Sequence, residues 1–259
     1  MRDIVLITSF DRPQCLRLCR EYLDKAGVQD KAVWICHDDR KHGYHGNTYN
    51  TMEAYKRAYE TDARYVYLVE DDVLVMPDFF QWHEALQEQG DFMCTLAYRC
   101  HRNPHVRQDV IDPTAYLTSR EDYASIGVCW KRENLAPVVA HASARYYGCM
   151  DSYMLQRFPH HPFGGDFSEQ DGLIMRVLKE TQGVTAWSYL PRAFHIGLWG
   201  YNRPNGRQLS LQELRNTIHD AAAIRKANTY HQDLKDIEPV PTSPTLAWDK
   251  KDLHRIQEF

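Results

Sequence analysis

Short apolar runs and helical patterns alternate along the chain from residue 4 to residue 98. Four runs predict strands: Ile4–Phe10, which is rich in β-branched residues and is expected to be buried, then Ala32–Cys36, Tyr65–Val69 and Phe92–Tyr98. Apolar residues at helical spacing predict three helices between and after these runs: one that Asp11 caps and Gly27 ends, then Thr48–Glu60 and Asp78–Gln89. This alternation predicts an α/β fold, a Rossmann-like, mostly parallel sheet flanked by helices.

The pattern is less regular in the second half of the chain. Ala124–Trp130 and Val184–Tyr189 predict short strands. Ser210–Lys226 predicts a helix that begins with a capping box, and the proline-bearing segment Ile237–Thr245 predicts an extended tail. We therefore expect one domain over residues 1–205, with a C-terminal helix and extended tail, residues 206–259, packed on it.

Composition narrows the class of protein. With 259 residues, 43% of them hydrophobic and 25% charged, the chain resembles an ordinary globular protein. No apolar run approaches the ~18 residues that span a bilayer, and the strand that begins at Ile4 starts too early for a signal peptide, so a cytoplasmic location is expected. Seven scattered cysteines without a Cys-x-x-Cys pair argue against a zinc finger or a disulfide framework.

Three consecutive carboxylates, Glu70, Asp71 and Asp72, follow the third predicted strand, and the apolar run Val73–Val75 comes directly after them. Burying such a cluster without compensation would cost several kcal/mol, so the pattern favours a divalent cation held by oxygen ligands over a solvated acidic turn. Ligands of parallel sheets bind beyond the carboxyl ends of the strands. The other two ends, Ser9–Arg12 and His37–Asp39, also carry polar groups, which predicts one shared site.

Glu70-Asp71-Asp72, followed by Pro77-Asp78-Phe79-Phe80, resembles the metal motif of the GT-A glycosyltransferases, closest to the N-acetylglucosaminyltransferase I type. Ile4–Arg12 resembles the opening strand and Asp-Arg turn of that family. The resemblance implies an inverting, metal-dependent transfer of a sugar from a nucleotide-sugar donor, with UDP as the expected nucleotide.

The same resemblance assigns roles to residues of the donor site. It implies that Asp72 ligates Mn²⁺ or Mg²⁺ and that Glu70 and Asp71 reach the ribose and sugar hydroxyls of the donor. Further donor contacts are expected from the other two strand ends, at Ser9, Arg12, Asp38 and Asp39. The late segment His195–Gly197 resembles a loop that closes over the donor, so His195 is expected to reach the metal or the diphosphate.

Asp171 resembles the catalytic base of the family, and Glu169 is its rival because the local spacing departs from the family pattern. An inverting transfer needs such a group to take the acceptor proton, and a helix N-terminus favours its ionised form. The plainer alternatives are that Asp171, with Ser168 three residues earlier, only caps a helix, and that His195 is a core histidine bonded to the backbone.

Two other functional classes remain open from the sequence. A sugar nucleotidyltransferase shares the sheet and the metal acids, but it usually has a glycine-rich loop after its first strand, which this chain lacks. A non-catalytic sugar-nucleotide-binding module is the second. The acceptor is a glycan, a small molecule, a protein or hydroxymethylated DNA. For DNA, the expected phosphate contacts are the segment Arg99–Arg107, with Arg192, Arg203, Arg207 and Arg215, and Trp199 or Tyr201 would hold a flipped base, although the net charge of −4 argues against it.

Overall fold

The structure is a computed structural model that describes residues 2–38, 46–98, 112–160, 168–199, 207–220, 222–224, 240–242, 248 and 250–255. Its centre is an eight-stranded sheet with the order β10-β6-β8-β5-β7-β3-β1-β2. The strands are β1 (Ile4–Ser9), β2 (Ala32–His37), β3 (Tyr65–Glu70), β5 (Cys94–Leu96), β6 (Ala115–Ser119), β7 (Val128–Lys131), β8 (Thr185–Ser188) and β10 (His254–Arg255).

The sheet is mixed, with a parallel half and an antiparallel insertion. β1 lies between β2 and β3 and is parallel to both. β8 runs parallel to β5, and β10 runs parallel to β6, but β6 and β8 are antiparallel to each other. β7 runs antiparallel between β3 and β5. The predicted α/β fold is thus confirmed. The fourth predicted strand, β5, does not pair with any of the first three, because β7 lies between β3 and β5.

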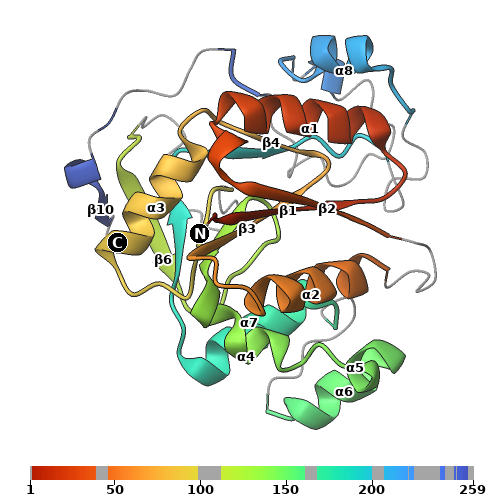
Figure 1. Ribbon diagram of the computed structural model, residues 1–259, viewed down its shortest axis with the longest axis vertical. Helices are drawn as coiled ribbons and strands as arrows, with labels where there is room; N and C mark the ends of the chain where they lie inside the picture. Colours follow the sequence, from red (N-terminus) through yellow and green to blue (C-terminus); the bar gives the residue numbers. More distant parts are fainter. Residues whose placement is uncertain are drawn as a thin grey trace.

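Helices cover both faces of the sheet (Figure 1). One face carries α1 (Pro13–Lys25), α3 (Phe79–Gln89) and α8 (Leu211–Thr217), and the other carries α2 (Gly46–Tyr59), α4 (Ala136–Val139), α5 (Ala144–Gly148), α6 (Met150–Arg157) and α7 (Gln170–Thr181). Side chains alternate between these faces as a strand requires. Leu6 and Leu68 belong to the core on the α2 and α7 side, whereas Ile7 and Val69 belong to the core on the α1 side.

A second, two-stranded sheet lies on the side of the main sheet that carries α1. It pairs β4 (Val73–Val75) with β9 (Ala193–His195) in antiparallel register, with Val73 opposite His195. β4 follows the acidic triplet directly and packs against α1. The small sheet therefore brings a segment from late in the chain next to the end of β3.

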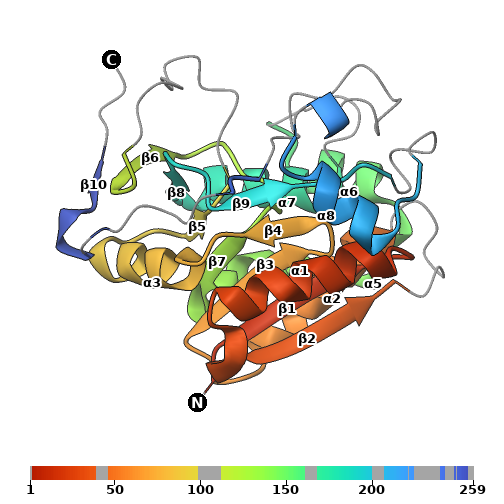
Figure 2. The same ribbon diagram turned by 90° about the horizontal axis from the view of Figure 1, so that it is seen from above.

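The last described residues join the main sheet. β10 lies beside β6 at the edge far from β2 (Figure 2). It is preceded by the short helix η5 (Lys250–Asp252), and Trp248 donates its indole N–H to Asp78 Oδ2 over 2.8 Å. This contact attaches the C-terminal segment to the start of α3.

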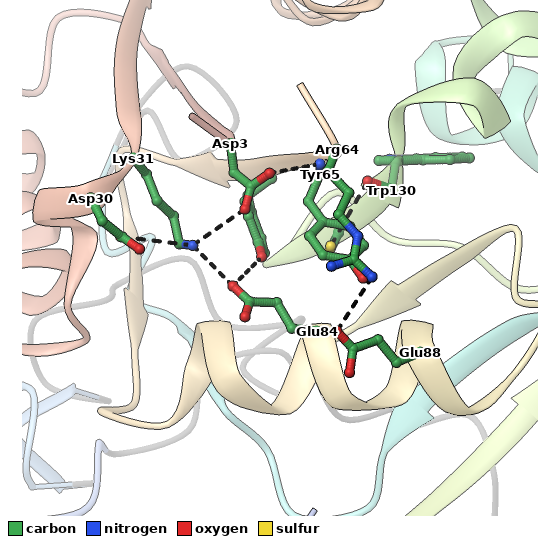
Figure 3. Close-up of polar contacts among 10 residues, drawn as sticks. Asp3, Asp30, Lys31, Arg64, Tyr65, Glu84, Glu88 and Trp130 are labelled. Atoms are coloured by element: carbon green, nitrogen blue, oxygen red, sulfur yellow. Dashed lines mark hydrogen bonds and ion pairs between the residues drawn. The ribbon is translucent and has the colours of Figure 1, made fainter. Parts of the chain in front are cut away.

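The buried side chain of Lys31 connects the amino-terminal ends of β1 and β2 to α3 (Figure 3). Lys31 Nζ lies 2.9 Å from Glu84 Oε1 on α3 and 3.6 Å from Asp3 Oδ2. Tyr67 donates its hydroxyl to the same Glu84 oxygen over 3.1 Å, and the Tyr65 backbone N–H donates to Asp3 Oδ1 over 2.9 Å. These contacts fix α3 against the strands from the side away from the acidic triplet.

Several predicted helix boundaries differ from those in the structure. Asp11 does not cap α1: it adopts a left-handed backbone with φ of 52°, and Arg12 is the N-cap residue. The N-cap of α7 is Glu169 rather than Ser168. Ser210 and Glu213 form the predicted capping box of α8, but that helix ends at Thr217 rather than at Lys226.

Two further short helices in the described residues connect larger elements. η1 (Val28–Asp30) follows α1, and η3 (Arg132–Leu135) leads from β7 into α4. None of the helices in the described part of the chain combines the length and the apolar character needed to cross a membrane.

Candidate metal and sugar-transfer site

The acidic triplet lies at the carboxyl end of β3, where the parallel half of the sheet ends. The Asp71 backbone N–H still donates to Thr8 O over 2.9 Å, which extends the pairing of β3 with β1. Asp71 and Asp72 are then buried, with 0% and 1% of their surface exposed, whereas Glu70 is half-buried. The carboxylates are therefore enclosed by protein, and an exposed acidic turn is excluded.

Arg12 compensates two of these charges. Its Nη2 lies 2.5 Å from Asp71 Oδ1, and its Nη1 donates to Asp72 Oδ2. The Phe10 backbone N–H donates to Asp71 Oδ2 over 3.2 Å, and the Ser9 side chain hydrogen-bonds the same carboxylate. The left-handed turn at Asp11 thus places Ser9 and Arg12 on the acids, and the hydrogen bonds from Phe10 and Ser9 favour a supporting role for Asp71.

His195 reaches Asp72 across the small sheet. Its Nε2 lies 3.1 Å from Asp72 Oδ2, and the Ile196 backbone N–H donates to Asp72 O over 2.7 Å. Gly197 follows so closely that an added Cβ would lie 2.5 Å from His195 Nε2 and 2.8 Å from Asp72 Oδ2. The chain needs a glycine here because the backbone passes directly against the Asp72–His195 pair.

Glu70, Asp72 and His195 form a group that fits a metal ion. One ligating atom from each of the three lies within 4.8 Å of the others. Asp72 Oδ1 and His195 Nδ1 are buried and have no hydrogen-bond partner. Because unpartnered buried polar atoms are rare in folded proteins, these atoms are available as ligands. Two carboxylates with one imidazole suit a transition metal such as Mn²⁺ better than Mg²⁺, which prefers oxygen ligands alone.

The charges within the group are strongly perturbed. Burial and the charge of Asp72 raise the pKa of Glu70 to about 8 and that of Asp71 to about 6. Burial opposes ionisation of Asp72 too, but Arg12 and His195 hold the pKa of Asp72 below its usual range. Burial opposes protonation of His195, whose pKa Asp72 nevertheless raises. The protein thus supplies too little positive charge for three ionised carboxylates, and a bound cation would supply the remainder.

Asp171 lies in the first turn of α7, on the same side of the sheet as α2. It is near enough that its charge contributes to the raised pKa of Glu70. Ser125 Oγ donates a hydrogen bond to Asp171 Oδ1. Burial raises the pKa of Asp171 to about 6, although the hydrogen bonds from Ser125 oppose this rise. A carboxyl group with that pKa is ionised at neutral pH and basic enough to accept a proton.

Three other predicted site residues, Glu169, Asp38 and Asp39, are not part of the metal-binding group that the described residues form. Glu169 is the half-buried N-cap residue of α7, and its charge, after burial, raises the pKa of Tyr146. The Asp38 carboxylate lies against Gly46 at the start of α2, so close that an added Cβ on Gly46 would overlap it. Asp39 lies outside the described residues.

The described arginines that were expected to contact DNA all pair with carboxylates of the protein. Arg192 is fully buried and donates from Nε to Asp78 Oδ2 over 2.9 Å, so the expectation of a phosphate contact there is wrong. Arg207 pairs with Glu213 and Arg215 pairs with Glu21. Trp199 is buried, and residues 99–107, Arg203 and Tyr201 lie outside the described part of the chain. The described residues give no support to a DNA acceptor.

Sequence reasoning missed Ser125, which no motif or periodicity marked. The segment Ala124–Trp130 was expected to be a strand, but β7 begins only at Val128, so Ser125 lies in the loop before it. The resemblance placed His195 at the metal or the diphosphate, but its direct contact with Asp72 was not predicted, because that contact depends on the pairing of β4 with β9 across more than a hundred residues. The glycine at 197 was the one local signal of a close approach.

Comparisons with known proteins find solved structures that are similar to this chain, but no matching sequence family. No family model and no curated protein matches the chain. Among solved structures, galactosyltransferase LgtC in complex with donor and acceptor sugar analogs is similar at 8% identity and a TM-score of 0.47, covering 90% of this chain and 99% of that one. The glycosyltransferase GlyE of Streptococcus pneumoniae TIGR4 is similar at 9% identity and a TM-score of 0.39, over 73% of this chain and 45% of that one.

A third similar structure is GalNAc-T7 with UDP, GalNAc and Mn²⁺, at 10% identity and a TM-score of 0.42; the match covers 83% of this chain and 48% of that one. At such identities and TM-scores, the similarities do not identify the activity of this chain.

Proposed function

We propose that this chain is a metal-dependent glycosyltransferase of the GT-A type, which moves a sugar from a nucleotide-sugar donor to an acceptor hydroxyl. The observation that carries the proposal is the group of Glu70, Asp72 and His195 at the carboxyl end of β3, with its unpartnered ligating atoms. A half-buried carboxylate of raised pKa, Asp171, lies within electrostatic range of that group. The resemblance of Glu70–Phe80 to the N-acetylglucosaminyltransferase I motif agrees with this arrangement.

In this proposal Glu70, Asp72 and His195 hold Mn²⁺. When bound, the ion neutralises the charge that develops on the departing nucleoside diphosphate. Arg12 pairs with Asp72 and thereby keeps this ligand ionised and oriented. Asp71 supports Arg12 from behind and holds the turn at Phe10.

The donor nucleotide, which we propose to be a uridine diphosphate, would lie over the carboxyl ends of β1 and β2. Asp38 follows β2, and its backbone N–H donates to Ser9 O over 3.0 Å, so the ends of these strands are joined. Ser9 and Arg12 belong to the first of these ends, and Asp39, outside the described residues, follows the second. Ligand binding at this edge is the rule for parallel sheets.

Asp171 is proposed as the general base of an inverting transfer. It would accept the proton of the acceptor hydroxyl while that oxygen attacks the anomeric carbon from the face opposite the diphosphate. With a pKa of about 6, Asp171 is ionised at neutral pH and is more basic than an ordinary aspartate. The acceptor is proposed to be a glycan or a small molecule with a free hydroxyl.

A donor screen tests this proposal. The chain would be incubated with UDP-, GDP- and TDP-sugars, with Mn²⁺ or EDTA, and the released nucleoside diphosphate would be measured. Slow hydrolysis of one UDP-sugar with Mn²⁺ alone is the expected result, because water replaces a missing acceptor. Tight, Mn²⁺-dependent binding of a donor without any release or transfer would instead identify a binding module.

The assignment of the base has its own test once a donor and an acceptor are known. Asp171→Asn is expected to lower kcat by about 10²–10⁴-fold and to change donor affinity little, since the base acts only in the transition state. Glu169→Gln is the matched control, two residues away on the same turn. If Glu169→Gln is the damaging change and Asp171→Asn is mild, Glu169 is the base.

A further inference from the structure

Ser125 lies against Asp171 in a way that the chemistry of a base requires. Ser125 is buried, with 3% of its surface exposed, and its Oγ donates to Asp171 Oδ1. Its backbone also hydrogen-bonds the same carboxylate. Two donors from one residue therefore fix the orientation of the carboxylate, and a carboxylate with about four acceptor positions retains capacity for a substrate proton.

The loop that carries Ser125 is itself anchored. Two residues before Ser125, the Tyr123 hydroxyl lies 2.9 Å from the Tyr55 hydroxyl of α2, which also accepts a hydrogen bond of 3.1 Å from Trp130 Nε1 of β7. Two residues after Ser125, Gly127 has a φ of 66°, and an added Cβ there would lie 2.6 Å from Ala193 Cβ. The loop is thus held on both sides by buried contacts.

The first turn of α7 is attached by a second, separate contact. Thr48 Oγ1 of α2 donates to Gln170 Oε1, and the Gln170 backbone N–H donates to Thr48 Oγ1 over 3.3 Å. This contact holds the helix next to Asp171 through Gln170 rather than through the carboxylate. Thr48 therefore offers a matched comparison for Ser125: both are buried hydroxyl residues that hold the same helical turn.

We propose that Ser125 is a positioning residue for the base: its hydroxyl and backbone hold the Asp171 carboxylate in one orientation and favour its ionised form. The inference rests on the proposed function, in which Asp171 takes the acceptor proton. Without Ser125, the carboxylate would lose donors that stabilise its charge, so its pKa would rise further. It would also lose the orientation that a near-attack geometry requires.

The test compares Ser125→Ala with Thr48→Val. In Ser125→Ala, the acid limb of the kcat–pH profile is expected to move upward by about one pH unit, and kcat at neutral pH is expected to fall by about 10- to 100-fold with donor KM unchanged. In Thr48→Val, the acid limb stays at its wild-type position, because that hydroxyl does not contact the carboxylate. Circular dichroism confirms that both variants are folded.

A titration of the Asp171 side chain by ¹³C NMR, assigned with Asp171→Asn, gives a readout without turnover. A higher Asp171 pKa in Ser125→Ala than in Thr48→Val supports the inference. Equal pKa values and equal acid limbs in the two variants overturn it. If the wild-type chain transfers no sugar at all, the proposed function fails, and the NMR titration still decides whether Ser125 controls the Asp171 carboxylate.

Discussion

Gly197 offers the sharpest perturbation of the metal group without removing a ligand. A Cβ at this position would lie 2.5 Å from His195 Nε2, whereas ordinary van der Waals contact begins near 3.4 Å, so Gly197→Ala must displace the imidazole or the backbone by about 0.9 Å. Metal–ligand distances tolerate only about 0.2 Å. The substitution is therefore expected to weaken binding of Mn²⁺ by about 10- to 100-fold, the range found when ligand-orienting contacts are lost.

Isothermal titration calorimetry with Mn²⁺ measures this change directly. Gly148→Ala is the matched control, because no atom lies within 4 Å of an added Cβ at that position. Its Kd for Mn²⁺ should equal that of the wild-type chain. An unchanged Kd in a folded Gly197→Ala protein would refute the reasoning, since it would show that the ion does not depend on the geometry of His195 and Asp72.

Other predictions concern pH, metal identity and stability. The rate of transfer should fall as the pH drops through about 6, because burial raises the pKa of Asp171 to about 6 and only the ionised carboxylate accepts a proton; a kcat–pH profile flat down to pH 4.5 would contradict this. Turnover with Mg²⁺ should be lower than with Mn²⁺ at equal concentration, and His195→Ala should reduce this preference; Mg²⁺ equal to Mn²⁺ in the wild type would argue against an imidazole ligand. Arg192→Met should destabilise the fold by about 3–5 kcal/mol in urea denaturation, because Asp78 would lose its buried partner, whereas Arg207→Met at an exposed pair should leave the midpoint unchanged.

Local sequence predicted the parts of the fold that local chemistry determines. The runs at β1 and β3 are apolar and β-branched because these strands are buried, and they were found close to their observed positions. The run at β2 was also found, although β2 is an edge strand in which only Cys36 is buried. The capping box at Ser210 was found for the same reason, since one turn of chain defines it. The strand order was not accessible in this way. β7 enters between β3 and β5 through contacts between segments more than thirty residues apart.

The same distinction between local and long-range contacts applies to the site. The acids at the end of β3 could be identified as a unit because they are adjacent in sequence. Their partners could not be placed: Arg12 turns onto Asp71 and Asp72 only through the left-handed backbone at Asp11, where an N-cap was expected. Ser125 acts on Asp171 from a loop without periodicity, so only the folded chain shows the contact.

The most direct test of the account is the Mn²⁺ dependence of UDP release from a UDP-sugar, compared between the wild-type chain and Asp72→Asn. Asp72→Asn keeps the shape of the side chain but removes one ligand charge, so both proteins should be folded with similar circular dichroism. We predict that release by the wild type rises with Mn²⁺ to saturation and disappears in EDTA, and that Asp72→Asn shows no Mn²⁺-dependent release. Equal release by both proteins in EDTA would contradict metal-dependent transfer at this site.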